Sequence, residues 1–251
     1  MDDQLIERMS ASDFNPKKYT IALVSVGSTE THGAHLPLST DTYVAYEIAK
    51  AVAAQVAHAF VVPPLFFGMS EHYRQGSFYV SLKAEHLVII LKDIFESIYS
   101  NGIRRIIVIN GHDGNIAPLE IAGRDFKVNH KDVVIAVLEK WWELPGKLLP
   151  EGFFDVWNGL GHAGEGETSI CLHLFPELVH MDRAKGRVPY IPANLDLKWD
   201  FSELTDTVAT GDPTKATAEK GRKMMEVVVD AVVSFIKEMD ANGWKYGFLK
   251  G

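Results

Sequence analysis

The alternation of short apolar runs with amphipathic stretches constrains the fold of this chain more than any other feature. Four runs rich in branched apolar side chains have the length of buried strands: residues 19–26, 60–67, 104–110 and 133–138. Apolar residues at helical spacing occupy other segments: residues 41–57, 84–99, a segment from about Pro118, 167–174 and 214–239. Strands that alternate with helices predict an α/β fold, with a mostly parallel sheet covered by helices on both faces.

No linker, repeat or low-complexity tract interrupts this pattern, so we expect one domain over residues 1–251. A chain of 251 residues is long enough to bury one large core. Residues 185–210 contain prolines and aromatic side chains without helical or strand periodicity. This segment predicts a long ordered loop that covers a site or forms a subunit contact.

The charge of the chain argues against nucleic acid as a partner. It has 25 basic and 33 acidic residues, whereas a nucleic-acid binder needs an excess of Lys and Arg. No apolar run reaches the roughly 20 residues needed to cross a bilayer, and the N-terminus lacks the pattern of a secretory leader. We therefore expect no membrane partner and a cytoplasmic location. The single cysteine, Cys171, excludes an intrachain disulfide and is expected to be a buried thiol.

The first polar cluster follows the first predicted strand, at residues 27–41, and contains Glu30, His32, His35 and Asp41. Carboxylate and imidazole groups are ligands that suit zinc, manganese or iron. In extended backbone, Glu30 and His32 point to the same side because side chains repeat every second residue. Asp41, at the start of a predicted helix, is placed to bridge two metal ions. The alternative is a polar loop with an aspartate that caps the helix.

The second cluster, NGHDGN at residues 110–115, follows the third predicted strand. Carboxyl ends of parallel strands meet at one edge of a sheet, where ligands bind in this architecture. The glycines beside His112 permit a tight turn and a close approach to an ion. Asp113 is a further ligand or an outer carboxylate. Taken alone, the segment is equally typical of a turn with a solvated histidine.

The third cluster lies at residues 161–169 and precedes an apolar helical run. Glu167 is a candidate ligand, and His162 or Glu165 is a candidate for proton transfer. A plain helix N-terminus favours acidic residues, but it does not account for His162 and three glycines. His72 also follows a predicted strand and is a candidate pocket residue.

Taken in order, these segments resemble the creatininase family of creatinine amidohydrolase-like proteins. The resemblance covers nearly the whole chain. It rests on four motifs: GSTETHGAHLPLSTD at residues 27–41, NGHDGN at 110–115, HAGEGETS at 162–169 and, more weakly, GDPTKATAEKG at 211–221.

The resemblance implies a three-layer α/β/α sandwich and a metal-dependent hydrolase with two divalent ions per subunit, which would be zinc, manganese or iron. It also implies a closed homo-oligomer, often a hexamer. Carried over residue by residue, it makes Glu30, His32, Asp41 and His112 the metal ligands, with Asp41 as the bridge. Glu167 matches a ligand or near-ligand carboxylate, and His162 matches a histidine that assists proton transfer.

The chain departs from the family pattern in two places. Creatininases carry a glutamate two residues after the histidine of the second motif, where this chain has Gly114. This argues against creatinine as the substrate and leaves Glu165 or Asp113 to supply the missing carboxylate. Many members have Phe-Pro-Gly-Thr where this chain has RQGSFYVSL at residues 74–82. Ser77 in that segment is therefore expected near the substrate, together with Asp113 and His72.

The expected function is hydrolysis of a small polar, cyclic amide or carbonyl compound by a metal-activated water. The family also contains formamide deformylases and hydrolases that open cyclic diketones, so these remain alternatives. An isomerase or an aldolase-type lyase would use the same ligands, and a non-catalytic metal-binding subunit is a further alternative. The chain lacks G-x-S-x-G, Walker A and H-E-x-x-H motifs, which argues against those enzyme types.

Overall fold

A four-stranded parallel sheet lies at the centre of the computed structural model, which describes residues 2–192, 194 and 197–247. All neighbouring strands in this sheet run parallel. Their order across the sheet is β3 (Ala59–Leu65), β1 (Ile21–Val26), β5 (Arg105–Asn110) and β6 (Val134–Leu138). The predicted α/β class and the four predicted strands are confirmed.

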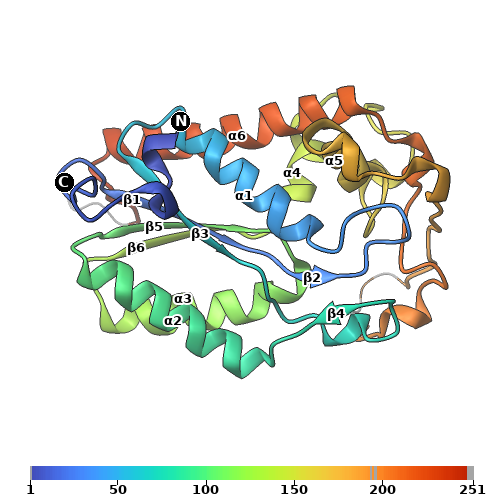
Figure 1. The fold of residues 1–251 in the computed structure, drawn as a ribbon, viewed down its shortest axis with the longest axis horizontal. Coiled ribbons are helices and arrows are strands. Elements are labelled where there is room, and N and C mark those ends of the chain that lie inside the picture. Colours follow the sequence, from blue (N-terminus) through green and yellow to red (C-terminus); the bar gives the residue numbers. More distant parts are fainter. Residues whose placement is uncertain (1, 193, 195–196, 248–251) are drawn as a thin grey trace.

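Helices cover both faces of the sheet, which gives three layers (Figure 1). One face carries α1 (Thr40–Ala53), α4 (Leu144–Leu148), α5 (Glu165–Leu174) and α6 (Ala218–Ala241). The other face carries α2 (Ala84–Ser100) and α3 (Ile116–Asn129). Short 3-10 helices occupy the connections: Asp2–Gln4, Ile6–Arg8, Glu71–Tyr73, Asp113–Asn115, Trp141–Glu143, Trp157–Gly159, Pro176–Leu178, Met181–Arg183, Phe201–Glu203 and Pro213–Lys215.

Strand β1 contributes to the core on both faces of the sheet. Ile21 and Leu23 belong to the apolar cluster that includes residues of α1 and α6, whereas Ala22 and Val24 belong to the cluster of α2 and α3. All six residues of β1 are buried, as expected for a strand that is covered on both sides. The continuous apolar runs in the sequence have this cause.

Two element boundaries differ from the predicted ones. The second strand, predicted at residues 60–67, is β3 at Ala59–Leu65, and it continues through Pro63-Pro64, where its register against β1 shifts. β3 is an edge strand, where missing amide donors are tolerated. Helix α3 begins at Ile116, two residues before Pro118, because proline is accepted in a first helical turn.

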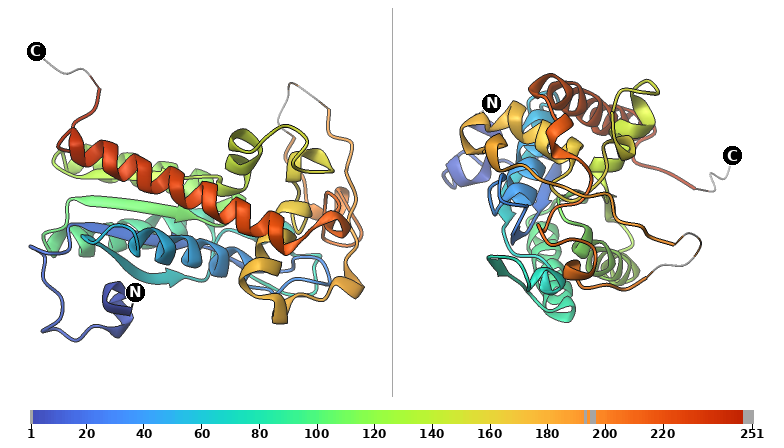
Figure 2. Two further views of the ribbon diagram at one scale, coloured as in Figure 1. Left: turned by 90° about the horizontal axis from the view of Figure 1, so that it is seen from above. Right: turned by 90° about the vertical axis from the view of Figure 1, so that its right-hand side faces the viewer.

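The carboxyl ends of the strands lie together on the right of Figure 1. There β1 continues into β2 (Thr29–Glu30), which pairs antiparallel with β4 (Tyr79–Val80). The right panel of Figure 2 looks onto this end, and residues of the 185–210 segment, in orange, run across it. The strand ends and the overlying loop therefore enclose the region where the sequence predicts a site.

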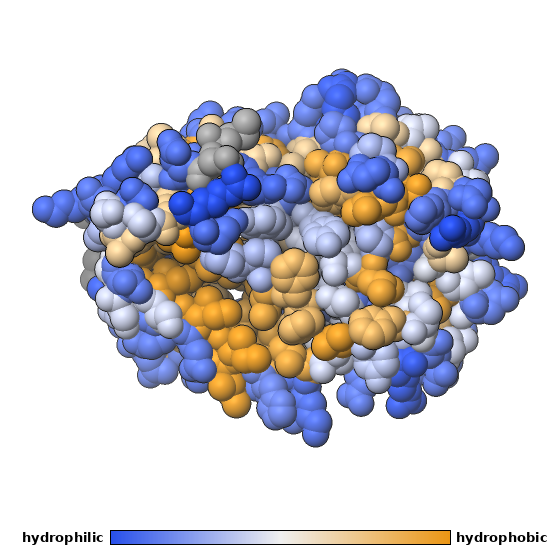
Figure 3. Space-filling view, in the orientation of Figure 1, coloured by the Kyte–Doolittle hydropathy of each residue, from blue (hydrophilic) through white to orange (hydrophobic). Residues whose placement is uncertain are grey.

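The surface in Figure 3 is largely hydrophilic, with apolar side chains gathered in its lower left part. Some large apolar side chains are exposed, among them Ile89 of α2 and Phe78 beside β4. Within the described part of the chain, no helix combines the length and apolarity needed to span a bilayer.

Candidate active site

The predicted metal ligands converge at the carboxyl ends of β1 and β5. Three groups of three side chains each have their ligand atoms within 4.8 Å of one another. Glu30, Asp41 and His112 form the first group, His32, Asp41 and Glu167 form the second, and Glu30, His32 and His162 form the third. Asp41 is shared by the first two groups, and its carboxylate lies between their histidines. Its Oδ1 lies 2.9 Å from His32 Nε2, and its Oδ2 lies 3.0 Å from His112 Nδ1.

A main-chain carbonyl fixes the orientation of each of the two histidines. His32 Nδ1 donates to the carbonyl of Glu30 at 3.2 Å, which turns Nε2 toward Asp41 and Glu167. His112 Nε2 donates to the carbonyl of Met69 at 3.0 Å, which turns Nδ1 toward Glu30 and Asp41. An outward N–H bound to an oxygen acceptor is the usual arrangement of a metal-binding histidine.

The site concentrates negative charge in a buried place, because Glu30 and Asp41 are almost completely buried. Burial lowers the pKa of His32, but the charge of Asp41 outweighs this effect and raises that pKa to about 9. The pKa of His112 is likewise raised well above its usual value, against the effect of burial, by the charge of Glu30. Burial raises the pKa of Glu167 to about 7. The protons on His32 and His112 thus offset the negative charge of the carboxylates, and bound cations would take over this role.

The donor set fits divalent metal ions. Glu30 Oε1 and Asp41 Oδ2 are buried and have no hydrogen-bond partner among the described residues. Both atoms lie close to His112 Nδ1, at 3.3 and 3.0 Å, but without the alignment of a hydrogen bond. Buried carboxylate oxygens without partners are costly unless an ion binds them. Imidazole nitrogens with carboxylates suit zinc, manganese or iron, as the sequence predicts.

His162 lies beside this cluster and is held by two hydrogen bonds. Its Nε2 donates to the carbonyl of Thr31 at 2.8 Å, which leaves Nδ1 to accept from the Tyr73 hydroxyl at 3.2 Å. Burial, with the positive charge of His32, holds the pKa of His162 well below its usual range. Burial also raises the pKa of Tyr73 well above its usual value. A neutral imidazole and a protonated phenol therefore form a pair at the wall of the site.

The structure does not bring Glu165 to the cluster, although the sequence analysis made it a candidate for proton transfer. Its buried carboxylate accepts from the backbone amides of Asp155 and Val156 and pairs with Lys220. His35, a possible ligand by its sequence position, is turned away to Thr168, with Nε2 2.9 Å from the threonine hydroxyl.

The three predicted substrate-binding residues have different positions. Asp113 is exposed and lines the pocket in front of Asp41. His72 lies behind the pocket lining, with its ring stacked on His112 at a centroid distance of 5.8 Å. Ser77 is exposed and contacts Thr31 through its hydroxyl at 3.1 Å, but it is not among the residues that line the pocket.

The pocket has a volume of about 390 Å³, and aromatic, aliphatic and polar side chains line it. Trp142 and Trp157 belong to its wall, while Trp141 is buried. The sequence analysis did not identify these two tryptophans or the further polar and aromatic residues of the wall, which are Tyr73, Lys140, Glu143, Trp199, Phe201 and Thr210. Trp199 and Phe201 come from the 185–210 loop. This loop covers the site, which is one of the two roles predicted for it.

Gly114, where creatininases carry a glutamate, has no room for a side chain. A Cβ at this position would overlap the carbonyl oxygen of Met69 and lie 2.6 Å from His112 Nε2. The same carbonyl orients His112. In this chain a glycine at position 114 therefore permits the contact that holds His112, a candidate metal ligand.

Comparisons with known proteins identify relatives over most of the chain. Residues 7–236 match the family profile described as creatininase, creatinine amidohydrolase. The mycofactocin precursor peptide peptidase of Mycobacterium ulcerans is 31% identical over 238 residues, which cover 90% of this chain and 88% of the relative.

Two solved structures share the fold. A candidate creatinine amidohydrolase of Bacteroides fragilis superposes with a TM-score of 0.84 at 26% identity and covers 100% of both chains. A glutamate-to-glutamine variant of creatininase, described as the Zn–Zn type, has a TM-score of 0.77 at 25% identity, covering 93% of this chain and 97% of its own. Given the profile match over most of its length and the metal-binding geometry of the site, the chain belongs to the creatininase family of metal-dependent hydrolases.

Proposed function

We propose that this protein hydrolyses a carbon–nitrogen bond of a small polar amide, preferably a cyclic one, at two divalent ions that share Asp41. The placement of the Asp41 carboxylate carries this proposal, because Oδ1 faces His32 Nε2 and Oδ2 faces His112 Nδ1. The Asp41 carboxylate has a histidine on each side, and Glu30 and Glu167 lie beyond these histidines. A hydrolase with two metal ions needs a shared carboxylate of this kind.

The chain's own residues supply positioning and proton transfer. When bound, two divalent ions supply an acidified water and polarise a substrate carbonyl. His162 is neutral and has its Nδ1 directed at the Tyr73 hydroxyl, so this nitrogen can take up a proton and return it to the leaving nitrogen. The hydrogen bond from His162 Nε2 to the Thr31 carbonyl fixes the ring for this role.

The shape of the pocket supports a small, flat substrate. Trp142, Trp157 and Trp199 offer ring faces and edges to such a molecule, and Lys140 adds one positive charge. Creatinine is not the substrate that we favour, because Gly114 replaces the family glutamate. Formamides and cyclic ketones are the alternatives within the family.

Hydrolysis of a peptide bond is a second candidate. The relative named as a mycofactocin precursor peptide peptidase is 31% identical across 90% of this chain. The same ligands and the same proton carrier would serve an open-chain amide. The wall formed by the 185–210 loop would then contact the side chains next to the scissile bond.

A substrate panel in oxygen-18 water tests the proposed chemistry. Metal-loaded protein is incubated with lactams and hydantoins, formamides, short peptides and cyclic ketones, and the products are analysed by mass spectrometry. We expect hydrolysis of an amide, incorporation of one oxygen-18 atom, loss of activity with a chelator and recovery with zinc or manganese. Turnover without oxygen-18 would indicate an isomerase or lyase, and no turnover of any compound would favour the non-catalytic alternative.

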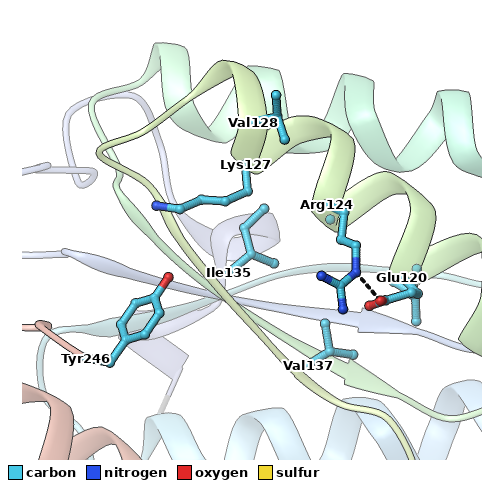
Figure 4. A pocket seen from close by; sticks show the side chains of 9 residues that line it. Glu120, Arg124, Lys127, Val128, Ile135, Val137 and Tyr246 are labelled. Carbon is cyan, nitrogen blue, oxygen red and sulfur yellow. Dashed lines mark hydrogen bonds and ion pairs between the residues drawn. The ribbon is translucent and has the colours of Figure 1, made fainter. Parts of the chain in front are cut away.

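We also propose that the chain forms a homo-oligomer through the open edge of its sheet, at β6. All five residues of β6 are apolar and half-buried, and the strand has no proline or charge that would protect an edge. Figure 4 shows the groove beside it, between Ile135 and Val137 of β6 and the α3 residues Arg124, Lys127 and Val128.

A second copy of the chain fits this edge through a two-fold axis. Antiparallel pairing of two β6 strands satisfies the free backbone groups of both. It also brings the α3 helices of the two copies together, and side chains of both charges, Glu120 and Lys127, line the groove.

We expect light scattering after gel filtration to give a multiple of the chain mass for the wild type and a lower mass for Val128→Glu. Val128 is 62% exposed in the chain, so the substitution adds a charge to the groove without disturbing the core. Leu178→Glu, at an exposed site outside the groove, is the control and should keep the wild-type mass. A monomeric wild type would refute the oligomer, and an unchanged mass for Val128→Glu would refute this contact.

A further inference from the structure

We propose that Lys220 is a positioning residue that holds the pocket wall at Trp157 in place through the buried carboxylate of Glu165. The positioning is visible in the contacts of the chain, and its effect on substrate binding rests on the proposed function. The conformation of the wall segment, the contacts of Glu165 and the packing of α6 support it.

The segment that carries Trp157 has an unusual backbone. Trp157, Asn158 and Ala163 have φ angles of 47°, 53° and 51°, in the left-handed region. Bulky side chains rarely adopt this region, and such conformations persist only where the surrounding structure holds them. Trp157 lines the pocket, so the unusual backbone determines where one aromatic wall of the pocket stands.

Glu165 anchors the residues immediately before Trp157. Its carboxylate is fully buried and accepts from the amide of Asp155 at 3.1 Å and from the amide of Val156 at 2.9 Å. The far end of the segment has separate support, because the amide of His162 donates to the hydroxyl of Thr210 at 2.8 Å. Loss of the Glu165 anchor should therefore move Trp157 more than His162.

Lys220 is the cation that stabilises Glu165 in its buried position. Its ammonium group pairs with both Glu165 and the side chain of Asp155, and donates to the carbonyl of Lys215 at 3.1 Å. The side chain of Lys220 is only 16% exposed. Removal of one partner of a buried ion pair leaves an uncompensated charge. Without Lys220, we expect Glu165 to release the amides of Asp155 and Val156.

Close packing of α6 on α5 fixes the position of Lys220. A Cβ on the neighbouring Gly221 would overlap the carbonyl oxygen of Ser169 in α5, so the two helices lie in direct backbone contact there. The Ser169 hydroxyl accepts from the amide of Thr217 at 3.2 Å and donates to the carbonyl of Glu165 at 2.6 Å. Lys220 and Glu165 thus meet in one geometry.

Hydrogen–deuterium exchange and steady-state kinetics on metal-loaded Lys220→Met test this proposal. We expect the amides of residues 155–159 to exchange about tenfold faster, with α6 and the central strands unchanged. For the amide substrate identified by the panel, KM should rise about 5- to 10-fold, which corresponds to the loss of one aromatic contact. The change in kcat should be smaller. The metal content should stay at the wild-type value.

Lys220→Arg retains a cation and should recover slow exchange and the wild-type KM. Lys223→Met, on the same helix but outside the ion cluster, is the matched control and should behave as the wild type. Unchanged exchange at residues 155–159 in Lys220→Met would overturn the proposal, and so would faster exchange throughout the fold. The exchange result does not depend on turnover, so failure of the proposed function would be recognised separately.

Discussion

Asp41→Asn is expected to lower kcat/KM for the amide substrate by more than about 100-fold and to remove bound metal. Substitution of residues that only support a ligand commonly costs about 10- to 100-fold in metal affinity or activity. Substitution of Asp41 should lower metal affinity and activity more than this, because its two oxygens face His32 and His112 in two different ligand groups. An amide in its place would offer one neutral oxygen and one N–H donor. Elemental analysis and steady-state kinetics on the same preparation would measure both effects.

Asp113→Asn is the matched control for this substitution. It makes the same chemical change in the same pocket, but Asp113 belongs to none of the ligand groups. We expect its metal content to equal that of the wild type, with any effect confined to KM. Retention of both ions in Asp41→Asn, with kcat near the wild-type value, would show that Asp41 is not the shared ligand.

His162→Asn should lower kcat by about 10²- to 10⁴-fold, the usual contribution of a general acid–base group, while metal content stays constant. Both ring nitrogens of His162 already have partners, Thr31 and Tyr73, and the ring is held neutral. The Tyr73 hydroxyl at Nδ1 gives His162 a partner for proton exchange, as a proton carrier requires. The variant should be assayed for metal by elemental analysis and for kcat on the amide from the panel.

Tyr73→Phe separates the two members of this pair, because it removes the hydroxyl group and keeps the ring. It should lower kcat less than His162→Asn does, since the imidazole can still take up a proton. His162 also has a ligand atom within 4.8 Å of those of Glu30 and His32. Loss of one metal equivalent in His162→Asn would therefore identify His162 as a ligand and refute its role as a free proton carrier.

The sequence predicted the sheet and the convergence of the candidate ligands because both depend on regular features. Buried parallel strands are continuous apolar runs, and the polar residues after two of them had to meet at one edge. Glu30, His32, Asp41 and His112 come together for that reason. The distinction between Glu165 and Glu167 depended on helix rotation. Side chains two positions apart on a helix point in directions that differ by about 200°. Only Glu167 therefore faces the cluster, while Glu165 faces Lys220.

The pocket wall could be predicted only in part. Tyr73, Trp199 and Phe201 come from segments without periodicity, and long-range contacts fix their positions. Tyr73 stacks on Phe201 with ring centroids 4.6 Å apart, across more than half of the chain. The space that excludes a side chain at Gly114 is likewise created by a distant residue, Met69. No local pattern in the sequence encodes such pairs.

Anomalous X-ray scattering at the zinc edge, on crystals of the zinc-loaded wild type, tests the central claim most directly. We predict two peaks per chain, one between Asp41, His112 and Glu30 and the other between Asp41, His32 and Glu167. A single peak would contradict the shared role of Asp41, and no peak at this cluster would contradict metal-dependent hydrolysis at this site.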